Sequence, residues 1–360
     1  MKKNSPFFIG LALFAMFFGS GNLTFPLVIG QFSKNIWPIA IIGFFVSAVL
    51  LPFTGALAMI NSKCNTKIFF NSFGKYLGGK YLIPILLTVW IPLGSAPRCI
   101  TVAHASIASY IPIPLWAFSL GFCLLVFALI YKKNNLLTII GYFLTPLLLL
   151  SLLLLLIAGI LTPATMQKTL DPKNIILAKS LMEGYNTMDL IAACFFASSI
   201  AKLINIDSNK NPIKIVFKAS VYGMILLGIV YFGLIYLAGK YSHVLQGVEK
   251  QSMLPVLAIA LLGPKMAIIS CFVIILACVT TLAALVHVYA EYLQTLKPKI
   301  LSKKHSSSII TLILTFGLSL IGFSGITSIS SPMLQVLYPV VIFIVLVSFS
   351  KNKKLATQTN

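Results

Sequence analysis

The sequence contains, near its N-terminus, the stretch Phe14-Ala15-Met16-Phe17-Phe18-Gly19-Ser20-Gly21-Asn22-Leu23-Thr24-Phe25-Pro26. Two glycines, a serine, an asparagine and a proline interrupt an apolar segment near its middle. Glycine lets the backbone leave helical geometry, and proline removes an amide donor. Backbone unwound at membrane depth is tolerated only where it lines a cavity or is buried in protein. The stretch therefore predicts either a broken transmembrane helix or close helix packing through small residues.

A broken helix would place backbone groups where a ligand can reach them. The freed amides at the start of the outer half-helix could bind a carboxylate. The freed carbonyls at the end of the inner half-helix could bind a cation. The pattern thus indicates a binding site for a zwitterion or an ion within the membrane.

A second stretch of the same kind lies near the middle of the chain. It reads Glu183-Gly184-Tyr185-Asn186-Thr187-Met188-Asp189 and precedes the apolar run Leu190–Ile200. Thr187 or Asp189 could cap the half-helix that follows. An acidic group at this depth is costly, so Asp189 is also a candidate for cation handling. The two stretches together favour two broken helices over coincidence.

Apolar segments of about 20 residues, long enough to cross a ~30 Å hydrocarbon core, recur along the chain. The chain has 360 residues, of which 59% are hydrophobic and only 9% are charged. We therefore expect an all-α polytopic membrane protein with no soluble domain. The predicted spans are residues 7–30, 36–60, 81–110, 115–131, 136–161, 175–202, 215–239, 266–296, 308–325 and 332–350. Residues 254–263 are apolar but too short to cross, which predicts a re-entrant or surface helix.

Ten spans divide into two halves of five. An odd number of spans in each half forces the second half into inverted topology, an arrangement common in secondary transporters. We expect a first repeat over residues 1–161, a second repeat over 175–350 and a cytoplasmic tail over 351–360. The predicted breaks then fall in the first span of each repeat.

The chain is strongly basic, with 27 lysines and arginines, 6 acidic residues and a formal net charge of +21. If the N-terminus is cytoplasmic, 19 lysines fall on the cytoplasmic side and 7 on the other. This bias is typical of lysines that set membrane orientation, and it explains the charge without nucleic acid. It predicts that both termini are cytoplasmic.

Three polar residues stand out inside other spans. Thr280 and Thr281 are adjacent in span eight, where two hydroxyls could flank a cation that prefers oxygen ligands, or could bond back to the preceding turn. Arg98, the only arginine, lies inside span three and needs a partner there. Its role could be structural, gating or linked to substrate.

The sequence lacks the motifs of several alternative classes. It contains no P-loop, no GxSxG or HExxH motif and no TVGYG-like filter, which argues against ATP-driven pumps, hydrolases and channels of those types. We therefore expect a secondary transporter that is not an enzyme and holds no cofactor. A sensor that has lost turnover and a divalent-metal carrier of the same fold remain alternatives.

Five groups of residues, in order along the chain, resemble those of the bacterial branched-chain amino acid:cation symporters (LIVCS, BrnQ type). They are residues 14–22 with Phe25-Pro26, Ala96-Pro97-Arg98, Gly184-Tyr185 with Thr187-Met188-Asp189, Ala277-Cys278 with Thr280, and Leu337-Tyr338-Pro339. The resemblance implies the LeuT-like fold and import of leucine, isoleucine and valine with Na⁺, or with H⁺, across the bacterial inner membrane. We expect no obligate protein partner.

The resemblance also implies roles for individual residues. The expected substrate-binding residues are Gly19, Ser20, Gly21, Asn22, Gly184, Tyr185 and Thr187. The expected Na⁺ site joins backbone carbonyls of Ala15, Phe18 and Ala277 to the hydroxyls of Thr280 and Thr281. Asp189 and Arg98 are expected in coupling or gating. The sequence departs from the family in having ten predicted spans where twelve are usual, and in having Ala105 where the family tends to have an acidic residue.

Overall fold

The structure is a computed structural model that describes residues 6–62, 65–71, 74, 77–131, 136–204, 212–296 and 304–357. Every regular element in these residues is a helix, as expected. Several lysines that entered the orientation argument lie outside the described residues: Lys2, Lys3, Lys63, Lys75, Lys132, Lys133, Lys210, Lys297, Lys299 and Lys303.

The first half of the chain contains the elements that correspond to predicted spans one to five. They are α1 (Pro6–Phe17), α2 (Ser20–Ser33), η1 (Lys34–Ile36), α3 (Trp37–Phe45), η2 (Val46–Leu50), α4 (Leu51–Asn61), α5 (Thr66–Asn71), η3 (Leu77–Leu82), α6 (Ile83–Trp90), η4 (Ile91–Ser95), α7 (Ala96–Ala108), α8 (Leu115–Tyr131) and α9 (Leu136–Leu161). Span one is interrupted after Phe17, whereas spans two and three continue through π-helical turns.

The second half contains the elements that correspond to spans six to ten. They are α10 (Lys173–Tyr185), α11 (Asp189–Ile204), α12 (Pro212–Lys240), η6 (Lys250–Ser252), α13 (Met253–Thr295), α14 (Lys304–Ser319) and α15 (Gly322–Thr357). The predicted break in span six is present between α10 and α11. The short apolar segment 254–263 is helical and runs into α13, but Gly263 leaves helical geometry with φ 75° and ψ 160°.

The predicted loop at residues 326–331 is wrong, because these residues lie inside α15. The chain turns earlier, and α15 begins at Gly322, whose φ of 78° glycine adopts without strain. The hydroxyls of Ser328 and Ser330 donate to the carbonyls of Ser324 and Ile326 one turn back. A serine-rich stretch that reads as a loop therefore stays helical.

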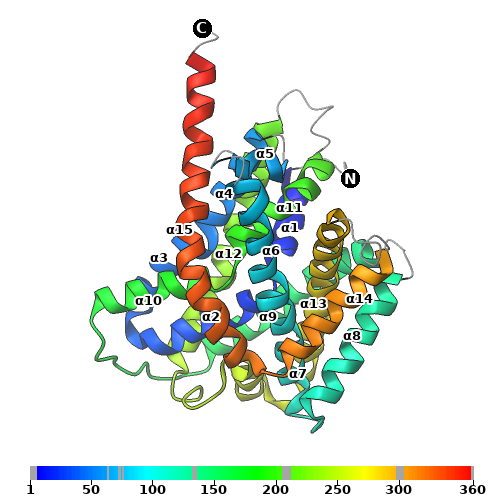
Figure 1. The fold of residues 1–360 in the computed structure, drawn as a ribbon. Helices are drawn as coiled ribbons and strands as arrows, with labels where there is room; N and C mark the ends of the chain where they lie inside the picture. Colours follow the sequence, from blue (N-terminus) through cyan, green and yellow to red (C-terminus); the bar gives the residue numbers. More distant parts are fainter. Residues whose placement is uncertain are drawn as a thin grey trace.

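The packing of the second half repeats the packing of the first. Helices α1 and α2 pack against α12, and α10 and α11 pack in the same way against α3 and α4. Helix α13 packs against α7 near the centre of the bundle. Figure 1 shows α1 inside the bundle and α10 at its edge, and the residues that follow α10 at the second break are buried. The two broken helices are therefore the elements that a central site would use.

Glycines allow the broken helices to approach their partners closely. A Cβ atom added to Gly30 of α2 would lie 2.4 Å from the carbonyl oxygen of Ile235 on α12. One added to Gly184 of α10 would lie 1.9 Å from the hydroxyl oxygen of Ser47 in η2. Any larger side chain would push each broken helix away from the helix that supports it.

Five helical stretches among the described residues are long and apolar enough to cross a membrane. Two exceed a single crossing: Ser20–Ile60, with 41 residues, turns at Lys34 (φ 47°), and Lys250–Thr295, with 46 residues, turns at Gly263. Three shorter apolar helices accompany them, Leu115–Tyr131, Pro146–Leu161 and His305–Ser319. Figure 1 shows α15 extending beyond the bundle at one end and the loop before α10 toward the other.

Candidate substrate and ion site

The first break separates α1 from α2 at residues 18–19. Gly19 has extended backbone and precedes α2, and its amide donates a 2.9 Å hydrogen bond to Oδ1 of Asn22 in the first turn. This bond fixes the asparagine side chain at the start of the half-helix. Pro26 lies within α2, one turn farther along. The residues that predicted the break therefore make it.

The second break separates α10 from α11 at residues 186–188. Met188 has a φ of 64°, and its sulfur atom accepts from the Ser95 hydroxyl at 3.5 Å. The hydroxyl of Thr187 donates to the carbonyl oxygen of Gly184 at 2.8 Å, so it satisfies the end of α10. Asp189 is the first residue of α11.

The two breaks contact each other directly. A Cβ atom added to Gly21 would lie 3.3 Å from the Cα of Thr187. Nδ2 of Asn22 donates a 2.6 Å hydrogen bond to Oδ2 of Asp189 and a second bond to the hydroxyl of Tyr231 on α12. The Tyr231 hydroxyl in turn lies 3.4 Å from Oδ2 of Asp189. Asn22, Asp189 and Tyr231 form a buried polar junction between both broken helices and α12, which we call the break junction.

A small cavity, the inner cavity, lies beside the break junction and has a volume of about 30 Å³. Its lining combines polar groups at the helix breaks with a set of apolar side chains, Trp90, Ala192, Phe196 and Leu285, which we call the apolar end. It is lined by Phe17, Gly19, Ser20, Gly21, Asn22, Trp90, Ser95, Thr187, Asp189, Ala192, Phe196, Thr281 and Leu285. This volume accommodates a few ordered waters but not the side chain of leucine.

Five of the seven expected substrate residues line the inner cavity, and Gly184 and Tyr185 do not. Gly184 packs against Ser47, as described above. Tyr185 is half-buried, and its ring lies 4.6 Å from that of Tyr338 on α15. These two residues therefore contact neighbouring helices and do not form part of the cavity wall.

The expected ion-site residues also separate into two groups. Thr281 lines the inner cavity, and its methyl carbon would lie 3.3 Å from a Cβ atom added to Gly19. Thr280 does not line it, and its hydroxyl donates to the carbonyl oxygen of Ala277 at 2.9 Å. Phe18 is buried at the first break. The side chain of Ala15 lies outside the part that the structure describes.

Arg98 joins the second break to α15. Its guanidinium is buried and donates to the carbonyl oxygen of Asn186 at 2.7 Å and to the hydroxyl of Ser330 at 2.5 Å. It also lies over the rings of Phe25, at 5.1 Å, and Phe323, at 5.8 Å. A cation at the carbonyl end of α10 complements the orphan acceptors and the dipole of that helix.

The carboxylate nearest to this arginine belongs to Glu183. Glu183 is buried, and Oε2 accepts a 2.9 Å hydrogen bond from Nδ2 of the same Asn186 whose carbonyl binds Arg98. Ala105, where an acidic residue was expected from the family, is buried on α7. Asn186 therefore bridges the arginine to an acidic residue on α10.

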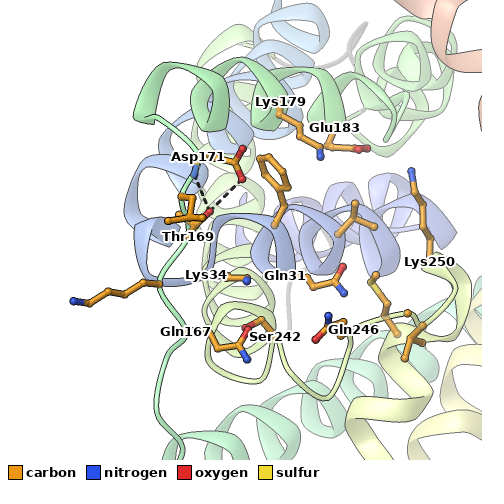
Figure 2. A pocket seen from close by; sticks show the side chains of 17 residues that line it. Gln31, Lys34, Gln167, Thr169, Asp171, Lys179, Glu183, Ser242, Gln246 and Lys250 are labelled. Atoms are coloured by element: carbon orange, nitrogen blue, oxygen red, sulfur yellow. Dashed lines mark hydrogen bonds between the residues drawn. The ribbon is translucent and has the colours of Figure 1, made fainter.

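A second hollow, the lysine-lined pocket, lies beside the loop before α10 and the loop after α12. It has a volume of about 680 Å³, and Figure 2 shows its labelled side chains coming from α2, η1, α10 and the loops before α10 and after α12. Its lining is Val28, Gln31, Phe32, Lys34, Gln167, Lys168, Thr169, Leu170, Asp171, Lys179, Glu183, Ser242, Gln246, Gly247, Val248, Lys250 and Met253.

Sequence reasoning missed Tyr231 and Glu183. Tyr231 lies in the predicted seventh span, where an aromatic residue with a hydroxyl reads as ordinary packing. Glu183 is the first residue of the second interrupted stretch, and the sequence alone does not indicate a role for it. An acidic residue beside an apolar span is a signal that could have identified it.

The sequence profile of the family described as Branched-chain amino acid transport protein matches residues 2–359. This chain belongs to that family. Its relatives include the branched-chain amino acid permease BrnQ of Corynebacterium glutamicum, 30% identical over 358 residues that cover 97% of this chain and 81% of the relative. They also include the branched-chain amino acid transport system 3 carrier protein of Pseudomonas aeruginosa, 30% identical and covering 95% and 79%.

Two solved structures share the fold of this family member. The inward-facing conformation of Mhp1 matches with a TM-score of 0.59 and 11% identity, over 95% of this chain and 75% of that one. The manganese transporter of Eremococcus coleocola, in complex with a bis-isothiourea compound, matches with a TM-score of 0.60 and 13% identity, over 96% and 78%. The predicted LeuT-like fold with broken first and sixth helices is confirmed.

Proposed function

We propose that this chain imports leucine, isoleucine and valine across the bacterial inner membrane by symport with Na⁺. The names of its relatives support the substrate class. The observation that carries the proposal is the contact of two helix breaks beside a cavity lined by both polar and apolar residues.

The inner cavity suits the two ends of an aliphatic amino acid. Backbone groups at Gly19 and Gly21 lie at the start of α2, where a carboxylate is favoured. Trp90, Phe196 and Leu285 line the apolar end, where a branched side chain would be buried. Because the cavity is smaller than leucine, binding requires the half-helices at the breaks to move apart. The break junction is then part of what must rearrange.

We assign the Na⁺ site to the face between the first break and α13. Thr281 lines the inner cavity with its methyl carbon beside Gly19, and a change of its χ1 rotamer would turn the hydroxyl toward the first break as an oxygen ligand. Thr280 donates its proton to Ala277, which leaves the lone pairs of its oxygen available to a cation. Carbonyls of Ala15, Phe18 and Ala277 would complete the shell. A site of neutral oxygens suits a hard monovalent cation.

Asp189 supports a second candidate, proton coupling. It is buried, and it is the only carboxylate among the described residues that line the inner cavity. A proton on this group would preserve the bond to Asn22, because the amide nitrogen donates to either oxygen form. The two coupling modes therefore place the ion on different sides of the same cavity.

Uptake of radiolabelled leucine into proteoliposomes tests the proposal. A Na⁺ gradient and a pH gradient are imposed separately at constant membrane potential. We expect saturable uptake with the Na⁺ gradient alone. Uptake with the pH gradient alone would assign the coupling to protons, and binding without uptake would assign the chain to the sensor class.

A further inference from the structure

The lysine-lined pocket is not part of the transport step described above, yet its size and chemistry resemble those of a ligand site. Its volume of about 680 Å³ falls in the range of small-molecule sites and far exceeds the 30 Å³ of the inner cavity. Val28, Phe32, Val248 and Met253 supply an apolar part of the wall. Apart from Leu170 and Gly247, the rest of the wall is polar or charged.

The charges of the pocket are mostly positive, with four lysines against two carboxylates. One lysine and one carboxylate are already held by the protein. Nζ of Lys179 lies 3.4 Å from the ring centroid of Phe32, and Oδ2 of Asp171 lies 3.2 Å from the hydroxyl of Thr169 (Figure 2). Lys34 and Lys250 lie on the η1 and η6 sides of the pocket, where they would attract a carboxylate.

Glu183 is the acidic group that the pocket offers to a ligand. Its side chain is buried with 7% of its surface exposed, and among the described residues no lysine or arginine nitrogen lies within 4.0 Å of its carboxylate. One hydrogen bond, from Asn186, reaches it. Lys179 and Arg98 interact electrostatically with this carboxylate, but neither forms an ion pair with it within 4.0 Å in the described residues. An ammonium group that entered the pocket could therefore still form a direct charged hydrogen bond with Glu183.

We propose that the lysine-lined pocket is an outer binding site for the zwitterionic amino acid, in which Glu183 binds the ammonium group and Lys34 and Lys250 bind the carboxylate. The aliphatic side chain then lies against the apolar wall. This inference rests on the proposed function only in taking an amino acid as the substrate.

The same carboxylate connects the pocket to the second break. Glu183 accepts from Asn186, whose carbonyl accepts from Arg98, which also donates to Ser330 on α15. An ammonium group on Glu183 would compete with Asn186 for the carboxylate. Occupancy of the outer site would thereby loosen the contact that holds the end of α10 to α7 and α15.

Protection of an introduced thiol tests the outer site without any gradient. Gln246 is exposed and lines the pocket, so Gln246→Cys is labelled with a membrane-impermeant methanethiosulfonate reagent in vesicles. The parent chain gives the background of the native thiols. The ligands are leucine and 4-methylpentanoate, which keeps the carboxylate and the side chain but lacks the ammonium group. We expect leucine to protect the introduced thiol from labelling more strongly than 4-methylpentanoate does.

Glu183→Gln retains an oxygen acceptor for Asn186 and removes the negative charge. It should raise the leucine concentration for half-protection by about tenfold, the scale of one charged hydrogen bond, and leave protection by 4-methylpentanoate unchanged. Glu249→Gln, an exposed residue outside the pocket lining, is the matched control and should have no effect. Equal weakening of both ligands by Glu183→Gln would mean that Glu183 is only structural, and would overturn the assignment.

A variant with a blocked inner cavity separates the two sites. Gly21→Val fills the contact between the breaks, and Ala192→Leu fills the apolar end if the first variant does not fold. Leucine should still protect the thiol in a folded variant of this kind. Loss of protection would show that the pocket only reports occupancy of the inner cavity. Because labelling needs no ion gradient, a failure of Na⁺ coupling leaves this result readable.

Discussion

The side chain of Asn22 on α2 donates a 2.6 Å hydrogen bond to the carboxylate of Asp189 on α11, across 167 residues of sequence. Each residue lies in the first turn of a half-helix that follows a break. The bond therefore links the two half-helices that, under the proposed function, move apart before leucine enters the inner cavity. Tyr231 bonds to the same pair and ties it to α12.

Replacing Asp189 should separate its structural role from a role in coupling. Asp189→Ala leaves Asn22 and Tyr231 buried without their acceptor, which costs about 1–3 kcal/mol for each unsatisfied group. We expect a lower thermal midpoint in detergent and at least about a tenfold loss of leucine uptake. Asp189→Asn keeps an oxygen acceptor and should retain Na⁺-driven uptake, with Glu249→Gln as the carboxylate-to-amide control. Selective loss of pH-dependent uptake in Asp189→Asn would favour proton coupling.

Replacing the adjacent threonines of α13 tests the proposed Na⁺ site. Valine keeps the shape of threonine but removes the hydroxyl, so each variant loses one oxygen ligand. Thr281→Val and Thr280→Val should both raise the Na⁺ concentration for half-maximal leucine uptake, and Thr281→Val should have the larger effect because Thr281 lines the inner cavity.

Thr315→Val is the matched control for this pair. Thr315 is buried on α14, and its hydroxyl donates to the carbonyl oxygen of Thr311, far from the breaks. Its Na⁺ dependence should match that of the unmodified chain. The Na⁺ site is misplaced if Thr280→Val and Thr281→Val behave like this control.

The apolar end of the inner cavity should select for long aliphatic side chains. Each buried methylene is worth about 0.8 kcal/mol, so alanine should compete at least about tenfold more weakly than leucine, and lysine and glutamate should barely compete. Leu285→Ala enlarges the apolar end. It should reduce the ratio of the alanine concentration to the leucine concentration needed for half-inhibition of uptake. Leu293→Ala, a buried residue of α13 outside the cavity lining, is the control. Equal inhibition by alanine and leucine in the unmodified chain would refute this account of selectivity.

The helix breaks could be predicted because their causes are local. Gly19, Pro26 and Asn22 act on the backbone within a few residues of their own positions. The helical segments could be predicted for the same reason, because segment length and apolar composition are local properties. The turn before α15 was misplaced because serines in an apolar segment can either form a loop or bond back within a helix.

The partners of the polar side chains could not be predicted in the same way. Tyr231 lies 209 residues from Asn22, and nothing in the sequence distinguishes it from the neighbouring Tyr222 or Tyr236. The bridge from Arg98 through Asn186 to Glu183 depends on how α7 and α10 pack. Such pairings are set by the rotation and depth of helices, which the hydrophobic pattern does not fix.

Both chain termini should lie in the cytoplasm. The lysine bias and the even number of predicted spans together predict this arrangement. A reporter that fluoresces only after export, fused behind Asn360, should therefore stay dark, and a cytoplasmic reporter at the same position should be bright. The reverse pattern would mean that the number of spans is wrong by an odd number.

Lys240, at the end of α12, should be needed for stability rather than for transport chemistry. Its Nζ donates to three carbonyl oxygens at the end of α9: Gly159 at 2.9 Å, Ile160 at 3.2 Å and Thr162 at 2.9 Å. These acceptors have no partner within their own helix, and an ammonium group carries the three donors that they need. The adjacent Tyr241 hydroxyl bonds to Gly159 and Thr162, and burial raises its pKa.

Lys240→Met keeps the length of the side chain and removes its donors. We expect a loss of stability of about 1.5–3 kcal/mol, the scale of hydrogen bonds to a charged group, seen as a lower thermal midpoint in detergent. The Na⁺ concentration for half-maximal uptake should not change in the protein that remains folded. Lys265→Met, an exposed lysine near the start of the long part of α13, is the control and should leave the midpoint unchanged. Equal midpoints for the two variants would show that the carbonyls at the end of α9 do not depend on Lys240.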